Sequence, residues 1–568
     1  MFFKKSVTLF SIATFLLTAT YADDKKNCAI KYKKNIVEYA DEHNPGHLLV
    51  LDYKKMKLLD KINVPGSVNH HADPMGTTKS ANYVMVIPKG SNYVNVLDIK
   101  SGNYVKKIHL PFRPRSADAY NAKYNLVLLN SRDRAAAVLI DATSLKIVGK
   151  AGFNNRCNFT KATPLPIDQL YADSENFNPN FKCLPVDFGG DQISGHPLWV
   201  SSEEFIILDR ANRVIHLYKI DKEGDRFYTR LVQTIKTDTS LHQVIPEDRS
   251  NPNNRVFYGS TEGNVAQGKP VMVYKFMLKH GLLKVIKSTK LSLDDIQGFA
   301  GHNLYITPDL RYLYAPSGAR AKEANVWVEG EWKYVKEKAY KWYWNWWSYS
   351  WVKYPFEYYV WKWTPGHWDN SVKTLTGGVF VIDTKSMRVV ADIEAGKGAG
   401  HVAFSEDKGV AIVTNHKDTF LTAIDYTTHT FIKNIPLNYQ RAGIFSLTQS
   451  HMQHIDEDGE YYYGFWSDGG VFFRVDLDDL EVDKSVKTGG IPIQGNWYKK
   501  VAINCDILAP AVEDGFNELF SQPEYNGAFG AYSVMDSEKA AQIVNKTTIE
   551  YIEKDSNENP ADTNDYDK

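Results

Sequence analysis

The stretch GHNLYITPDLRYLYAP at residues 301–316 alternates apolar runs with an acidic turn, and this pattern decides the fold. The same unit recurs as GHVAFSEDKGVAIVTN at 400–415 and as SHMQHIDEDGEYYYGF at 450–465. Each copy predicts a strand, a turn at an acidic residue and a second strand. A third strand often follows and ends in Asp, at Asp98, Asp141, Asp383, Asp425 and Asp476. Units of this kind are typical of the four-stranded blades of a β-propeller.

Anchor positions mark where each unit starts, and helical periodicity is almost absent from the chain. The sequence therefore predicts an all-β fold, a seven-bladed β-propeller over residues 23–510. Two long gaps between anchors predict insertions at about residues 152–192 and 322–370. The seven anchors are His71, Ser116, His196, His242, His302, His401 and His451.

The two ends of the chain have compositions of their own. Residues 1–22 combine Lys4 and Lys5 with an apolar run at 7–17 and small residues up to Ala22, which predicts a secretory signal peptide and a periplasmic protein. No other stretch is continuously apolar over ~18 residues, so we expect the mature protein to be soluble. Residues 511–568 are expected to form a partly disordered C-terminal extension, because the tail from Glu553 onward is rich in acidic residues and Asn.

The overall charge is balanced, with 67 Lys and Arg against 67 Asp and Glu in 568 residues. This balance argues against nucleic acid, and against an anionic membrane surface, as the main partner.

Four cysteines in an exported chain favour disulfides. Cys157 and Cys183 would staple the first insertion, and a Cys28–Cys505 bridge would tie the N-terminal strand to the last blade, where a propeller must close. The alternative is four buried free thiols. The chain has no Cys-x-x-Cys-His motif, which argues against a covalent c-type haem.

Histidine recurs at the anchors, and equivalent positions of different blades converge on the axis of a propeller. A single histidine of this kind is more often a satisfied core residue. A buried ring of imidazoles, however, would repel if protonated and lose hydrogen bonds if neutral, whereas a metal resolves both problems. The set exceeds one tetrahedral zinc, and imidazole ligands also suit copper, so we expect a multinuclear copper site. The predicted ligands are His70, His71, His196, His242, His302, His401 and His451. His454 is left out because three residues along a strand separate it from His451, which points it to the other face.

A second set of polar residues lies where the second strands end, on the same edge as the first strands begin. These residues are Lys89, Arg132, Arg210, Glu262, Ser317, His416 and Asp468. Lys89 and Glu262, together with Arg115 beside the Ser116 anchor, are our candidates for holding an anion and moving protons. The alternative is that each is simply a solvated loop charge.

The His70–His71 pair in the first blade and the single axial histidines in later blades resemble the copper-cluster domain of nitrous oxide reductase. No two-Cys, two-His, Met motif of a cupredoxin domain follows Cys505, and Ser116 replaces the histidine of the second blade. The chain is therefore more similar to the thiocyanate dehydrogenase family of single-domain copper propellers. That resemblance implies oxidation of thiocyanate, a small inorganic anion, to cyanate and sulfur, with electrons passed to an external acceptor such as cytochrome c.

Three rival functions stay open. One is a nitrous oxide reductase-like enzyme that acts on another small substrate. A non-enzymatic or metal-storing propeller would bind a ligand or partner, and a hydrolase or lyase would need one metal and no electron acceptor. Metal analysis distinguishes these last two functions from a copper oxidoreductase.

The insertion at 322–370 contains ten of the thirteen Trp residues, with many Tyr and Lys between them. Its run WYWNWW at 342–347 predicts a strand hairpin with aromatic residues on both faces. Three interpretations are open: an interface for an electron-transfer partner or a homodimer, a lid over the propeller, or an interfacial membrane contact.

Overall fold

The structure is a computed structural model. Its described residues form strands and turns, and none of them is helical. No helix in this part of the chain meets the length and apolarity needed to cross a membrane. The chain divides into two compact units, residues 1–320 with 376–568, and residues 321–375. The described residues are 36–41, 47–64, 69–75, 81–88, 91–99, 102–117, 119–152, 159–160, 163–164, 192–248, 251, 254–264, 268–323, 326–328, 330–369, 372–437, 448–451, 454–456 and 458–498.

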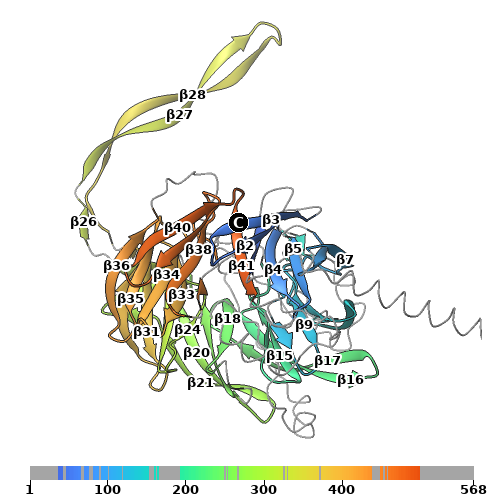
Figure 1. The fold of residues 1–568 in the computed structure, drawn as a ribbon. Coiled ribbons are helices and arrows are strands. Elements are labelled where there is room, and N and C mark those ends of the chain that lie inside the picture. The colour runs from blue at the N-terminus through green and yellow to red at the C-terminus, as the bar shows by residue number, and fades with distance from the viewer. Residues whose placement is uncertain are drawn as a thin grey trace, which may run out of the picture. The chain divides into compact units, whose positions relative to one another are not determined.

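Seven sheets of the first unit follow the order of the chain, and their described strand pairs are antiparallel (Figure 1). The first three are β4 (Asn69–Pro74), β5 (Tyr83–Pro88), β6 (Tyr93–Asp98) and β7 (Tyr104–His109); β8 (Ala119–Asn121), β9 (Leu126–Asn130), β10 (Ala137–Asp141) and β11 (Lys146–Ala151); and β14 (Leu198–Trp199), β15 (Glu204–Asp209), β16 (Val214–Glu223) and β17 (Arg226–Lys236). The fourth is β18 (Leu241–Pro246), β19 (Val256–Thr261), β20 (Met272–Lys279) and β21 (Leu282–Lys290). A small pair, β12 (Phe159–Thr160) with β13 (Thr163–Pro164), lies in the first insertion.

The fifth sheet has seven strands, because the second insertion starts and ends within it. Its strands are β22 (Ser292–Leu293), β23 (Ile296–Gly301), β24 (Tyr305–Ile306), β25 (Tyr312–Glu323), β30 (Val372–Thr374), β31 (Gly378–Asp383) and β32 (Val389–Glu394). The sixth is β33 (Ala399–Ser405), β34 (Val410–Asn415), β35 (Phe420–Asp425) and β36 (Thr430–Pro436), and the seventh is β37 (His454–Ile455), β38 (Tyr461–Trp466), β39 (Val471–Asp476) and β40 (Glu481–Lys487).

An eighth sheet joins the two ends of the described chain. It contains β1 (Ile36–Asp41), β2 (His47–Asp52), β3 (Lys57–Asn63) and the last strand β41 (Pro492–Tyr498), which pairs with β1. In Figure 1 the orange strand β41 accordingly lies among the blue strands of the N-terminus.

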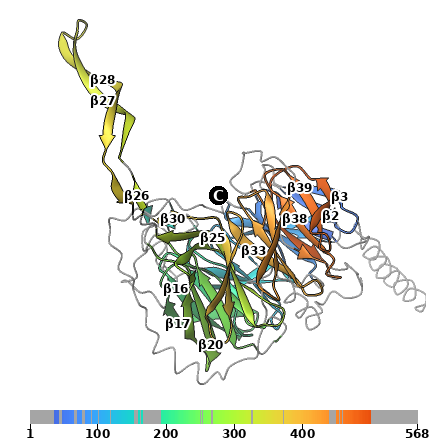
Figure 2. The same cartoon turned by 90° about the vertical axis from the view of Figure 1, so that its left-hand side faces the viewer.

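Apolar clusters between neighbouring sheets close these eight sheets into a ring (Figure 2). The last junctions involve the eighth sheet, where Leu51 packs in one cluster with Phe465 and Leu48 packs in another with Val84. The all-β propeller fold is confirmed. The count of seven blades is not confirmed, because eight sheets of the described residues form the ring. The eighth sheet takes its three outer strands, β1 to β3, from the beginning of the described chain and its inner strand, β41, from the end.

The strand-ending Asp residues of the repeat make the turn between the third and fourth strands. Asp141 Oδ1 accepts hydrogen bonds from the backbone N–H groups of Thr143 and Ser144, at 3.2 and 2.6 Å. The residue four positions after the Asp is left-handed, as at Leu145 with φ 55°, and the strand register shifts beside the turn. The same geometry follows Asp383, Asp425 and Asp476. A short polar side chain that satisfies turn N–H groups thus fixes each hairpin.

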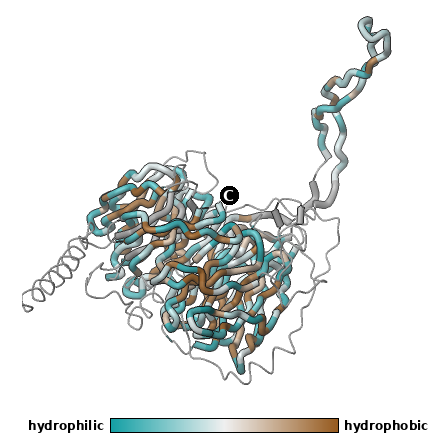
Figure 3. Tube along the Cα trace, turned by 90° about the vertical axis from the view of Figure 1, so that its right-hand side faces the viewer, coloured by the Kyte–Doolittle hydropathy of each residue, from teal (hydrophilic) through white to brown (hydrophobic). Residues whose placement is uncertain are grey.

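The second unit is a long two-stranded ribbon. Its strands β27 (Glu331–Asn345) and β28 (Ser350–Thr364) pair over their whole length, and β26 (Val326–Val328) pairs with β29 (His367–Asp369). In Figure 3 the hydrophobic segments concentrate in the propeller strands, while this ribbon is mostly hydrophilic to neutral.

Candidate metal centre

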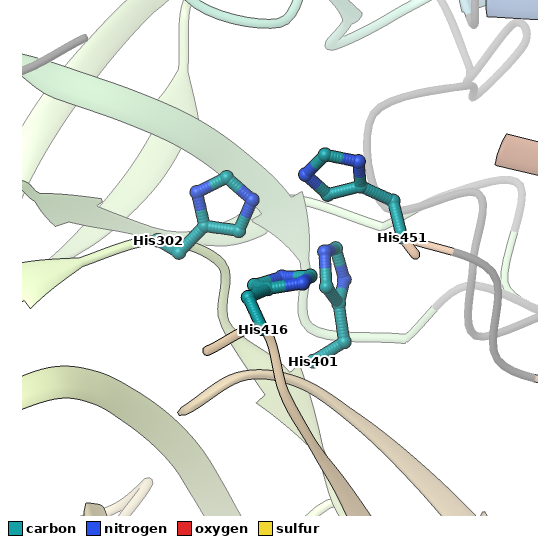
Figure 4. A group of neighbouring side chains, drawn as sticks. All are labelled: His302, His401, His416 and His451. Carbon is teal, nitrogen blue, oxygen red and sulfur yellow. The ribbon is translucent and has the colours of Figure 1, made fainter. Parts of the chain in front are cut away.

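Four histidine side chains gather at one point of the propeller (Figure 4). One ring nitrogen each of His302, His401, His416 and His451 lies within 4.8 Å of the others, and all but His451 are buried. His302 follows β23, His401 lies in β33, His416 follows β34 and His451 precedes β37. Three consecutive sheets therefore bring imidazoles that are far apart in sequence to one place. An all-imidazole donor set suits copper or zinc.

The group of imidazoles extends into two further sheets. The ring centroid of His242 lies 4.4 Å from that of His302, and the ring of His196 lies 5.1 Å from that of His242. Six imidazoles are therefore contiguous, which is more than the four that one tetrahedral ion uses. We call these six residues, namely His196, His242, His302, His401, His416 and His451, the imidazole cluster.

Irregularities in the inner strands aim these side chains. Side chains of a regular strand alternate between its two faces, which here pack on neighbouring sheets. The register of β18 with β19 shifts between Leu241 and Gln243, so His242 is the extra residue of a bulge. The register of β33 with β34 shifts likewise between Ala399 and His401. Bulges bend a strand and redirect a side chain, which explains how these histidines leave the packed faces.

The glycine before three of the histidines leaves room for a close approach. A Cβ atom on Gly400 would lie 2.5 Å from the His416 ring, and one on Gly195 would lie 2.5 Å from the His242 carbonyl oxygen. A Cβ on Gly301 would lie 2.6 Å from the Thr261 carbonyl oxygen. The repeated Gly-His dipeptide is thus explained by packing, because only a residue without a side chain lets the neighbouring strand come this near.

Hydrogen bonds orient the rings of the cluster. His242 Nδ1 lies 2.9 Å from Glu262 Oε1 and His416 Nδ1 lies 2.9 Å from the Gln449 carbonyl oxygen, so in both cases Nδ1–H donates. His401 Nδ1 lies 2.5 Å from the Tyr305 hydroxyl. In this arrangement, typical of metal-bound histidine, the second ring nitrogen is left to bind. The buried Nε2 atoms of His242 and His401 have no hydrogen-bond partner in the described part of the chain.

Burial and nearby positive charges disfavour the protonated form of two rings of the cluster, His242 and His401. Burial, and then the neighbouring His302, hold the pKa of His242 well below its usual range, with contributions from Arg115 and Arg210. Burial, and then His416, do the same for the pKa of His401. A neutral imidazole can give its lone pair to a metal. The two buried guanidinium groups bring positive charge to the edge of the cluster at His242.

The structure describes two of the three predicted proton-transfer and anion-binding residues. Glu262 is fully buried, receives a hydrogen bond from Arg210 at 2.5 Å and accepts one from His242, so its described contacts orient His242. Arg115 donates to the Ser194 carbonyl oxygen at 2.6 Å. Lys89 lies outside the described residues. The roles predicted for these three residues stay predictions.

The predicted ligands have different outcomes. His196, His242, His302, His401 and His451 come together, whereas the side chains of His70 and His71, in β4, and the four cysteines lie outside the described part. Ser116 Oγ lies 3.5 Å from His196 Nδ1, so the anchor without histidine still borders the cluster. The four-histidine group does not include His454.

Sequence reasoning missed His416 as a ligand. It placed this residue only among the second-strand ends at the edge of the ring. Pairing of Ala399 with Asn415 brings the start of β33 and the end of β34 together, and this puts His416 beside His401, at 5.0 Å between ring centroids. The signal was present in the sequence, because His416 is the one histidine among the residues at the second-strand ends.

Replacing Gly400 by Ala is expected to displace His416 and to weaken metal binding about 10- to 100-fold, as losses of ligand orientation do. The measurement is bound metal per chain over a titration with a competing chelator. His416→Ala should match Gly400→Ala, and the double variant should be no weaker than His416→Ala alone, because both changes remove one ligand. Fully additive losses would show that Gly400 acts elsewhere.

Comparisons with known proteins find matches only among solved structures, at low identity and with TM-scores below 0.5. No family model matches the chain, and no curated protein matches it. Among solved structures, dihydro-heme d1 dehydrogenase NirN in complex with DHE matches with a TM-score of 0.49 and 13% identity, over 82% of this chain and 76% of that one. Apo AztD from Citrobacter koseri matches with a TM-score of 0.42 and 10% identity, over 83% and 98%. BamB from Moraxella catarrhalis matches with a TM-score of 0.39 and 9% identity, over 73% and 87%.

Proposed function

We propose that this chain is a periplasmic copper-dependent oxidoreductase that oxidises a small anion at the imidazole cluster, with thiocyanate as the substrate. The observation that carries the proposal is the buried four-histidine group, extended by His242 and His196. A structural core has no need of six contiguous imidazoles, each of which must find hydrogen-bond partners.

The residues present fit copper. The Nε2 atoms of His242 and His401 are buried donors without a hydrogen-bond partner among the described residues, and the Nδ1 atoms of the same rings are held by Glu262 and Tyr305. His416 is held through Nδ1 by a backbone carbonyl. Copper bound to these nitrogens would supply one-electron redox chemistry.

The choice of an anion follows from the charges around His242. Arg115 and Arg210 are buried there, and both lower the pKa of His242 because their positive charge reaches the ring. Glu262 partly balances the Arg210 charge, and we propose that Arg115 and Arg210 together attract the substrate. Burial strengthens this attraction, since water screens it little.

Thiocyanate follows from the resemblance to thiocyanate dehydrogenases. Thiocyanate and one water give cyanate, sulfur, two protons and two electrons, and two oxidised cytochrome c molecules take one electron each. In this proposal Glu262 fixes the orientation of His242. It is also the proposed base that takes a proton from water, and the assay below tests this second role. Glu262 is the candidate that takes a proton first, and both protons pass on to solvent water, while Lys89 is proposed to balance the negative charge of the substrate.

The assay combines copper-loaded protein with thiocyanate and oxidised cytochrome c. We expect haem reduction and cyanate formation in a 2:1 ratio, both lost in His401→Ala. Glu262→Gln keeps the shape and the contact with His242, so it should retain copper but lose most of the activity if the carboxylate also accepts a proton. Bound copper without either product would contradict thiocyanate as the substrate. A chain that binds no metal would be a ligand- or partner-binding propeller.

A further inference from the structure

The ribbon of the second unit, which we call the aromatic hairpin (Glu331–Thr364), exposes its aromatic side chains. Trp346 is 74% exposed, Trp347 is 97% exposed and Tyr349 is 76% exposed, and all three lie in the loop between β27 and β28. The loop is ordered by Asn345, whose Oδ1 accepts a hydrogen bond from the Trp347 N–H at 3.0 Å, and by the left-handed Tyr349 at φ 48°. A structured loop thus presents large aromatic rings to the surroundings.

Charges are segregated along the aromatic hairpin. Its proximal half, residues 331–337 and 357–364, has three lysines and three glutamates. All six are paired, as Lys333 with Glu331, Lys336 with Glu357 and Lys362 with Glu337. The distal half, residues 338–356, has three lysines and no acidic residue. Within the described residues, no carboxylate forms an ion pair with Lys338, Lys341 or Lys353.

Two of the three distal lysines lie against aromatic rings instead. Lys341 Nζ lies 4.7 Å from the centre of the Phe356 ring, and Lys353 Nζ lies 4.1 Å from that of Tyr340. Their ammonium groups are therefore held beside the aromatic surface, with their charge available to a partner. A partner that complements this half must be anionic and must also accept aromatic side chains.

Aromatic residues cover both faces of the distal half. Residues directly opposite in an antiparallel pair share a face, so Trp344 and Trp351 lie on one face and Tyr343 with Val352 on the other. A folded protein partner would cover one face of a two-stranded ribbon. A lipid interface surrounds an inserted tip, and it favours Trp and Tyr at the headgroup level with lysines nearby.

We propose that the distal half of the aromatic hairpin inserts its tip into the headgroup region of an anionic lipid bilayer. Trp346, Trp347 and Trp351 enter the interface, and Lys341 and Lys353 contact lipid phosphates. The balanced charge of the whole chain argued against an anionic membrane as the main partner. The charge is not balanced locally, however, because the distal half has three lysines and no acidic residue. The inference is independent of the imidazole cluster.

The test uses the purified full chain with two kinds of vesicle, phosphatidylcholine alone and phosphatidylcholine with 30% phosphatidylglycerol. We expect flotation with the anionic vesicles at low salt and a blue shift of Trp emission, because ten of the thirteen Trp lie at 322–370 and Trp199 and Trp466 are buried. Binding should weaken at high salt, since salt screens the lysines.

Matched variants separate the tip from the rest of the aromatic hairpin. Lys341→Gln with Lys353→Gln should weaken binding roughly 30-fold, since each lysine near an anionic surface contributes about 1 kcal/mol. Trp346→Ser with Trp347→Ser should weaken it about tenfold or more, because binding scales with the apolar area inserted. The proximal controls Lys333→Gln with Lys362→Gln and Trp332→Ser with Trp363→Ser should change it less than about twofold. All four variants should unfold at the wild-type temperature, since the substituted side chains are exposed.

Three results would overturn the proposal. The first is no binding of the wild-type chain to anionic vesicles at low salt. The second is equal binding to both kinds of vesicle, or equal losses from tip and proximal variants. The third is a concentration-dependent dimer that the tip variants abolish while vesicle binding stays absent, which would assign this surface to a second copy of the chain.

Discussion

Replacing His302 and His401 together by alanine is expected to abolish metal binding. The two rings lie 5.0 Å apart between centroids, and both belong to the four-histidine group. His302 also links this group to His242, at 4.4 Å, so its loss divides the imidazole cluster into two parts. Loss of a group that only hydrogen-bonds to a metal ligand costs about 10- to 100-fold in metal affinity, so the loss of two ligands should exceed about a hundredfold.

The measurement is copper per chain after reconstitution and gel filtration, with visible absorption as a second readout. The control variants are His109→Ala and His280→Ala, which remove exposed imidazoles outside the cluster and should bind copper as the wild type does. His302→Gln with His401→Gln keeps more of the side-chain volume and separates ligand loss from a packing defect. Unchanged copper content in a folded double variant would contradict the metal centre and, with it, the proposed oxidoreductase.

The propeller could be predicted because each repeat is determined by interactions between residues that are close in sequence. Asp141 and its equivalents make the same hydrogen-bonded turn in successive sheets, and the middle strands are apolar on both faces because each sheet packs on two neighbours. The eighth sheet is marked by no anchor. Its inner strand β41 comes from the far end of the chain and has no anchor histidine, so it cannot be recognised as a unit by its spacing.

Most of the imidazole cluster was predictable from the anchors, whereas the contacts that place His416 and Glu262 depend on the pairing of strands. His416 joins the cluster because β33 and β34 pair with a bulge at Gly400, and register is not visible in a single sequence. Glu262 was predicted to hold an anion or to move protons, and its contacts with Arg210 and His242, which come from other strands, are not visible in the sequence. Contacts between side chains of different sheets depend on how the sheets pack around the ring, and local sequence patterns do not determine that packing.

Ending the chain after Ile491 is expected to prevent folding of the propeller. This truncation removes β41, which pairs with β1 from Ile36↔Tyr498 to Asp41↔Pro492 and forms the inner strand of the eighth sheet. Without it, β1–β3 form a three-stranded sheet with an unpaired inner edge. Leu48, Leu49 and Leu51, which are buried in the clusters on either side, would lose part of that cover. Burial of each such side chain contributes about 1.5–3 kcal/mol, and the net stability of a domain is only about 5–15 kcal/mol.

The matched control ends after Lys500, so that both truncated chains lack Cys505 and residues 511–568, and they differ only by β41 and two further residues. We expect the longer chain to be soluble and to unfold in one cooperative transition, and the shorter chain to aggregate or to show no such transition, because a ring of packed sheets loses its closure when one inner strand is missing. Circular dichroism and thermal unfolding measure both. If the chain that ends after Ile491 unfolds at the same temperature as its control, the pairing of β41 with β1 does not close the ring. If both chains fail to fold, folding requires residues beyond 500. The predicted Cys28–Cys505 disulfide is then the first feature to test. That test restores residues 501–510, once with Cys505 and once with Cys505→Ser.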